Sequence, residues 1–174
     1  MNVRIIVPIL LAYAFAAAAG AFAASVPTAD QQFVQRAYED GYAEVVLGKM
    51  AMQNGATDAA KMYGERMVTD RSRDINRLAK LAAADGVSVE MALPAEAQEE
   101  LAKLQRLSGP AFDSAYVGYE ADDHRKAIAA YQRESTSTKN AALKGYVDRS
   151  LPVLETHEAL ARKAAAQVGA PGGS

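Results

Sequence analysis

Five side chains of the types that ligate metals are spread over four stretches of this sequence. They are Glu44, Asp70, Asp123, His124 and His157. Carboxylate oxygen and imidazole nitrogen together suit iron, manganese or zinc. With only two histidines in the chain, these groups predict at most one bound ion.

Arg71, directly after Asp70, supports a different interpretation of the same residues. A guanidinium stays protonated and cannot ligate a metal, but it can pair with Glu44 inside a protein. A buried charge costs several kcal/mol unless it is paired or bound to a metal. The sequence therefore leaves two hypotheses. One is a structural network of ion pairs and hydrogen bonds, which Arg71 favours, and the other is a mononuclear metal-binding or redox site.

The elements that must position these residues are four long amphipathic helices. Apolar residues recur at spacings of three, four or seven in four stretches, and this pattern is typical of a helix with one buried face. Thr57 is a suitable cap before the second helix, and Gly86 a suitable stop after it. The predicted helices span residues 30–54, 57–85, 110–138 and 140–168, and a shorter helical segment spans residues 94–107.

Each of the four helices carries polar candidates within about one turn of its midpoint, which predicts a site at one level inside a bundle. The paired Glu-x-x-His motif of di-iron oxidases is absent, because Ala121 and Leu154 stand three residues before the two histidines. Asp123 and His124 are neighbours, so their side chains point about 100° apart on a helix. Both side chains therefore cannot point straight at the centre of the bundle, and the sequence leaves open whether both face inward.

The first 23 residues are typical of a secretory signal peptide. A basic start that includes Arg4 precedes an apolar stretch, and Ala21-Phe22-Ala23 fits a cleavage signal. We expect export to the periplasm or an association with the outer membrane, with no membrane span after cleavage. An uncleaved membrane anchor is the alternative. Residues 24–29 are then a lead-in, 30–168 a single bundle domain, and 169–174 a disordered tail.

Composition excludes some classes of function. Removal of Arg4 with the signal peptide takes the formal net charge from −2 to −3, and this balance argues against nucleic acid as a partner. The chain has no cysteine, so disulfides and a lipid-modified cysteine are excluded. Packing alone must stabilise the domain.

Several strings, taken in order, resemble the domain-of-unknown-function family 4142, a family of exported bacterial proteins that often carry an outer-membrane label. The strings are AE at 43–44, LGKMA at 47–51, YGERMVTD at 63–70, LSGPAFD at 107–113, DH at 123–124 and LPVLETH at 151–157. The resemblance covers residues 30–168 and implies a ferritin-like four-helix bundle without an established activity. The family pattern has Asp-His in the second helix, where this chain has Asp70-Arg71.

These observations predict an all-α, ferritin-like four-helix bundle with a short extra helical segment between its second and third helices. We expect a binding or envelope-maintenance role, rather than catalysis, with a protein or small-molecule partner that the sequence does not identify. The alternative is the metal-binding or redox protein described above.

Overall fold

Five α-helices account for most of the chain that the computed structural model describes, residues 28–168, and this range contains no β-strand. The helices are α1 (Thr28–Asn54), α2 (Asp58–Ala84), α3 (Ala95–Leu104), α4 (Gly109–Ser137) and α5 (Ala141–Val168). The predicted bundle of four long helices, with a short helix between the second and third, is confirmed. The expected signal peptide, most of the lead-in and the tail lie outside the described residues, and α1 already includes Thr28 and Ala29.

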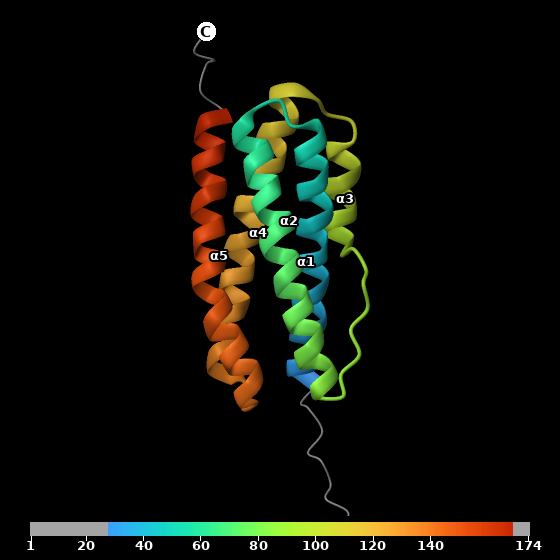
Figure 1. The fold of residues 1–174 in the computed structure, drawn as a ribbon, viewed down its shortest axis with the longest axis vertical. Helices are drawn as coiled ribbons and strands as arrows, with labels where there is room; N and C mark the ends of the chain where they lie inside the picture. Colours follow the sequence, from blue (N-terminus) through green and yellow to red (C-terminus); the bar gives the residue numbers. More distant parts are fainter. Residues whose placement is uncertain (1–27, 169–174) are drawn as a thin grey trace, which may run out of the picture.

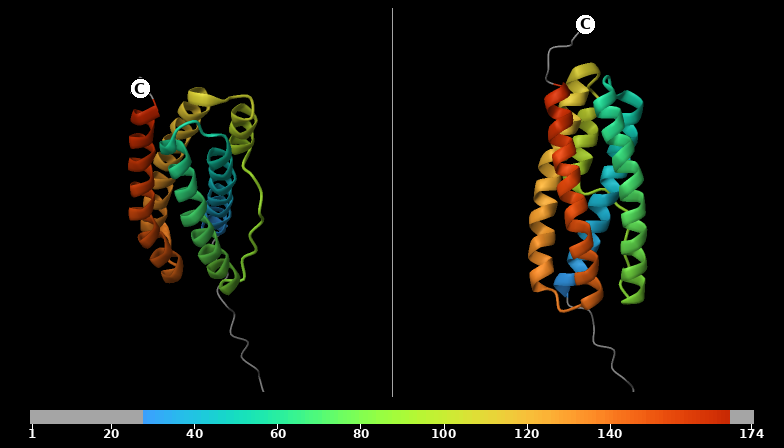
Figure 2. Two further views of the ribbon diagram at one scale, coloured as in Figure 1. Left: turned by 45° about the horizontal axis from the view of Figure 1, so that its top comes forward. Right: turned by 60° about the vertical axis from the view of Figure 1, so that its left-hand side comes forward.

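The four long helices form two antiparallel pairs, in which α1 packs along α2 and α4 along α5. The connection from α2 to α4 travels the length of the bundle and includes α3, so α2 and α4 run in the same direction (Figure 1). A long crossover between two helical hairpins is characteristic of ferritin-like bundles. The crossover lies on the side of α1 and α4, where α3 contacts both helices (Figure 2).

The helix ends follow the local signals that the sequence predicted. The Thr57 hydroxyl accepts a hydrogen bond from the Ala60 N–H at 3.3 Å and caps α2. After α2, Gly86 adopts φ +69°, a left-handed conformation that favours glycine. Gly109 adopts φ +59° at the first position of α4, directly before Pro110. These local choices set the lengths of the helices and so the level of their midpoints.

Side chains of α4 and the neighbouring loops hold the two hairpins together at both ends of the bundle. The Asp113 carboxylate accepts hydrogen bonds from the N–H groups of Ala56, at 2.9 Å, and Thr57, at 2.7 Å. At the opposite end, the Thr138 hydroxyl donates to Asp30 at 2.7 Å. These contacts join residues that are distant in sequence, so they fix the register of one hairpin against the other.

The apolar core consists of two clusters. One cluster includes Leu47, Met67, Phe112 and Ala161, and the other lies around Leu78. On each long helix, the candidate polar residues lie between the positions that contribute to these clusters. The bundle thus has a polar layer between two apolar halves. None of the helices in residues 28–168 combines the length and apolarity needed to cross a membrane.

The pairing of α1 with α2 depends on a close approach of two backbones at Gly48 and Gly64. A Cβ atom on Gly64 would lie 2.6 Å from the Gly48 carbonyl oxygen, and one on Gly48 would lie 2.8 Å from the Gly64 oxygen. Only hydrogen fits at these positions. The close contact also lies one turn beyond Glu44, so it constrains the distance between the helices at the polar layer.

We expect Gly64→Ala to lower the free energy of unfolding by about 1–3 kcal/mol, because the added methyl group pushes the two backbones apart. The measurement is urea unfolding followed by circular dichroism. Gly118→Ala is the matched control, since a Cβ there meets nothing within 4 Å, and it should add about 0.5–1 kcal/mol. An equal increase in the free energy of unfolding in both variants would contradict the close approach of the two backbones at Gly48 and Gly64.

Candidate functional site

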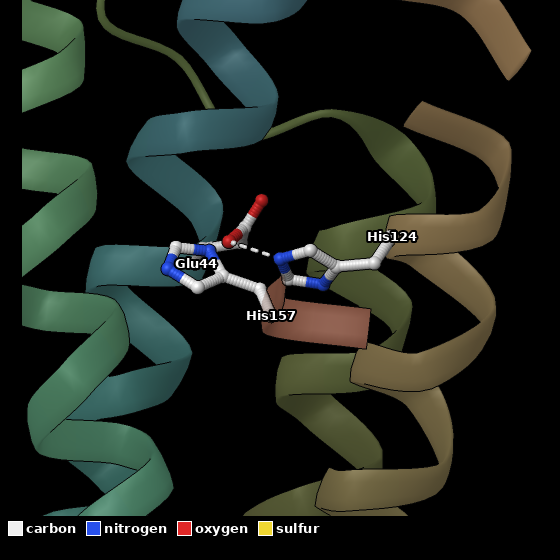
Figure 3. Close-up of side chains that lie close together, drawn as sticks. All are labelled: Glu44, His124 and His157. Carbon is white, nitrogen blue, oxygen red and sulfur yellow. Dashed lines mark ion pairs between the residues drawn. The ribbon is translucent and has the colours of Figure 1, made fainter. Parts of the chain in front are cut away.

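Glu44 of α1, His124 of α4 and His157 of α5 meet in the polar layer (Figure 3). One potential ligand atom from each of the three lies within 4.8 Å of the other two. The side chains are at most 1% exposed. The rings of His124 and His157 are arranged edge to face, with centroids 5.4 Å apart. Three helices thus bring one carboxylate and two imidazoles together out of contact with solvent.

Arg71 of α2 completes the layer, so all four long helices contribute a side chain to it. Its Nε donates to Glu44 Oε2 at 2.6 Å, and its Nη2 donates to Glu44 Oε1. Burial opposes ionisation of Glu44, but the charge and the hydrogen bonds of Arg71 outweigh it and lower the pKa of this carboxyl. Glu44 is therefore a carboxylate. The ion pair that Arg71 suggested from the sequence is present.

His124 is oriented by the backbone of its own helix. Its Nδ1 lies 2.9 Å from the Glu120 carbonyl oxygen, and since a carbonyl only accepts, Nδ1 carries the proton. Burial lowers the pKa of His124, against the effect of Glu44, so the ring is neutral. Its Nε2 then turns a lone pair toward Glu44 Oε2, 3.3 Å away. This nitrogen has no hydrogen-bond partner within residues 28–168.

His157 is oriented in the same manner by a carboxylate. Its Nε2 donates to Asp70 Oδ2 at 3.1 Å. Burial alone would raise the pKa of Asp70, but the hydrogen bonds from His157 and Arg66 outweigh burial, so the pKa is lowered. Burial and Arg71 lower the pKa of His157 to about 4, so this ring is neutral at pH 7. Its Nδ1 is buried without a hydrogen-bond partner in the described part of the chain.

The two imidazoles therefore share one arrangement. Each donates its outer N–H to an oxygen of the protein, and each has an inner nitrogen without a hydrogen bond that faces Glu44 (Figure 3). Metal-bound histidines almost always have their second nitrogen fixed in this way. Bonds of about 2.0–2.2 Å to a metal place two ligand atoms at most about 4.4 Å apart. The ligand atoms of Glu44, His124 and His157 lie within 4.8 Å of one another, so small side-chain rotations bring them to that geometry.

The structure brings together some of the predicted site residues. Glu44, His124 and His157 form the group, and Asp70 contacts His157 without belonging to it. Asp123 lies beside His124 in the sequence but not among the three. Burial and the charge of Glu44 raise the pKa of Asp123 to about 7. Of two adjacent residues on α4, only His124 faces the centre of the layer.

Glu120 is a buried acid that sequence reasoning missed. It is fully buried, neither carboxyl oxygen has a hydrogen-bond partner among residues 28–168, and Oε2 lies 3.8 Å from His124 Nδ1. Burial and the charge of Glu44 raise the pKa of Glu120 well above its usual range and so favour its protonated form. The i, i+4 spacing from His124 was the available signal, since it places both residues on one face of α4.

Comparison with known proteins agrees with the resemblance seen in the sequence. The model of the family described as "Domain of unknown function (DUF4142)" matches residues 15–164. The chain belongs to this family. No curated protein and no solved structure matches it. The family description assigns no activity, so the geometry of the polar layer carries the functional argument.

We expect Arg71→Met to lower the free energy of unfolding by about 3–5 kcal/mol, because it leaves the Glu44 carboxylate buried without its partner. Adding Glu44→Leu should restore most of this loss, since both charges are then gone. Arg73→Met is the control, as this side chain is 68% exposed and its loss should change stability by no more than about 0.5 kcal/mol. Urea unfolding measures all three, and similar values for Arg71→Met and Arg73→Met would argue against the buried pair.

A pH-dependent stability is expected from Asp40, one turn before Glu44. Burial raises the pKa of Asp40 from 3.8 to about 6, with Arg36 opposing the rise and Glu44 adding to it. Between these values the folded chain keeps a proton that the unfolded chain releases, so stability falls as the pH rises through this window. Asp40→Asn should therefore raise the free energy of unfolding by about 1–3 kcal/mol at pH 7 and hardly change it at pH 4.

Unfolding at both pH values tests this expectation, with Asp122→Asn as the control because its side chain is 62% exposed. The control should show a change of no more than about 0.5 kcal/mol at either pH. A stabilisation by Asp40→Asn that is the same at pH 4 and pH 7 would show that proton binding is not its cause.

Proposed function

We propose that this protein binds one metal ion in the centre of the bundle, with Glu44, His124 and His157 as its ligands. The observation that carries the proposal is the pair of unpaired inner nitrogens, one on each imidazole, which face the same carboxylate. Two imidazoles and one carboxylate suit iron, manganese or zinc. Asp70 and the Glu120 carbonyl hold the two rings in the orientation that binding requires.

The structural network, the other hypothesis, explains only part of the layer. It accounts for the bidentate pair of Glu44 with Arg71. It leaves two buried nitrogens without partners, each at a cost of about 1–3 kcal/mol, and it places a lone pair of His124 against a carboxylate oxygen. A cation between these atoms removes both costs. The metal hypothesis therefore accounts for more of the geometry.

Arg71 tunes the proposed site without blocking it. A carboxylate offers about four lone-pair positions, and the bidentate guanidinium uses one on each oxygen. The remaining positions of Glu44 can still reach a metal. Because Arg71 balances the charge of Glu44, we expect weaker binding than at a site with an unpaired carboxylate.

Burial of the ligands bears on what the ion does. Glu44, His124 and His157 are almost inaccessible to solvent, and a substrate would need an open position at the metal. We therefore propose a role in holding an ion, or in electron transfer, rather than in conversion of a bound substrate. The signal-peptide pattern of residues 1–23 supports the bacterial envelope as the place of this role.

Calorimetric titration of the metal-free protein with Zn²⁺, Mn²⁺ and anaerobic Fe²⁺ tests the proposal. We expect one ion per chain for at least one of these metals, and no such binding by the His124→Ala, His157→Ala double variant. Asp123→Asn is the control and should keep the binding, since Asp123 lies outside the ligand group. At a free metal concentration about 100 times the dissociation constant, the metal should add about 2.7 kcal/mol to the free energy of unfolding.

Arg71→His extends the same experiment to α2, the long helix that contributes no proposed ligand. Arg71 contacts Glu44, so an imidazole at this position removes the competing charge and adds a potential ligand. We expect this variant to bind the same metal about tenfold or more tightly, which corresponds to about 1.4 kcal/mol. Absence of stoichiometric binding by both the wild type and Arg71→His would overturn the proposal, as would binding that survives loss of both histidines in a folded variant.

A further inference from the structure

A groove of about 410 Å³ lies between α2 and α5, on the side of the bundle opposite the crossover. Its lining is strongly basic, with five guanidinium groups against two carboxylates. The arginines are Arg66, Arg71, Arg73, Arg77 and Arg149, and the acids are Asp70 and Asp74. The groove therefore carries an excess of positive charge, although the chain as a whole has a formal net charge of −2.

The two acids of the groove are already engaged by other groups. Asp70 accepts hydrogen bonds from His157 and Arg66. Asp74 accepts one from the Tyr146 hydroxyl at 2.7 Å and lies 3.6 Å from Arg71. Asp70 also lies 4.0 Å from Arg73. Neither carboxylate forms an ion pair with Arg77 or Arg149.

Three donors in the groove have no such partner. Within residues 28–168, Arg77 of α2 and Arg149 of α5 make no ion pair or hydrogen bond, and the Ser150 hydroxyl makes no hydrogen bond. Ser150 is 7% exposed and lines the same hollow as the two arginines. Arg73 and Arg77 are also four residues apart on one helix, an arrangement of like charges that is unfavourable by itself.

We propose that this groove binds an oxyanion, a phosphate or carboxylate group, between Arg77 and Arg149, with Ser150 as a further donor. Guanidinium groups bind such anions through paired, charge-assisted hydrogen bonds. The two arginines come from helices that belong to different hairpins, so an anion between them joins the two halves of the bundle. The volume of the groove accommodates a small organic acid or a phosphate ester.

This inference does not rest on metal binding, although Asp70, Arg71 and His157 belong both to the wall of the groove and to the polar layer. The anion would bind to unpaired arginines that take no part in the ligand group. The experiment therefore uses metal-free protein, and the His124→Ala variant, which removes a proposed metal ligand that lies outside the groove, should keep the anion site. Loss of metal binding and loss of anion binding can thus be told apart.

Calorimetric titration at low salt with citrate and with inorganic phosphate is the test. We expect one anion per chain, with the affinity reduced at least about tenfold in Arg77→Gln, Arg149→Gln, because this variant removes the charged hydrogen bonds that hold the anion. The matched control is Arg125→Gln, Arg162→Gln, which removes the same charge from side chains that are 68% and 72% exposed and lie outside the groove. The control should bind as the wild type does.

A parallel sedimentation experiment with phosphatidylglycerol vesicles, compared with phosphatidylcholine vesicles, identifies the source of the oxyanion. Binding to the anionic vesicles alone that is lost in Arg77→Gln, Arg149→Gln assigns the groove to a lipid headgroup. Binding of free citrate or phosphate with the same loss assigns it to a soluble anion. The proposal is overturned if neither binds, or if the groove variant and the control variant lose affinity equally.

Discussion

The carboxylate of Glu44 and the guanidinium of Arg71 meet in the interior, where neither charge can remain without the other. This pair joins α1 to α2. One turn further along α1, Gly48 and Gly64 bring the same two helices into backbone contact. The pair also fixes the direction of the Glu44 carboxylate. Both imidazoles of the polar layer are arranged around that fixed group, so their geometry depends on it.

The polar layer forms only when the two hairpins have packed correctly. Glu44 and Arg71 belong to the first hairpin, whereas His124 and His157 belong to the second. The contacts of Asp113 and Thr138 at the two ends of the bundle set the register between the hairpins. Residues distant in sequence therefore reach one level through interactions made elsewhere, and the apolar clusters on either side hold them there.

Local chemistry explains what the sequence could predict. The spacing of apolar residues, the cap at Thr57 and the stop at Gly86 are properties of a few neighbouring residues, and so the helices were predictable. The rotation of α4 about its axis is not local, because it depends on packing against three other helices. For that reason the sequence could not separate His124 from Asp123, or show that Arg77 and Arg149 line one groove.

The course of the crossover makes the molecule different on its two long sides. Near α1 and α4, the hollow beside Arg71 measures about 30 Å³, enough for one or two water molecules. Near α2 and α5, the hollow that reaches Arg71 and His157 measures about 410 Å³. The interior around Arg71 thus lies nearer to solvent on one long side of the bundle than on the other, and that side is the one on which the arginines gather.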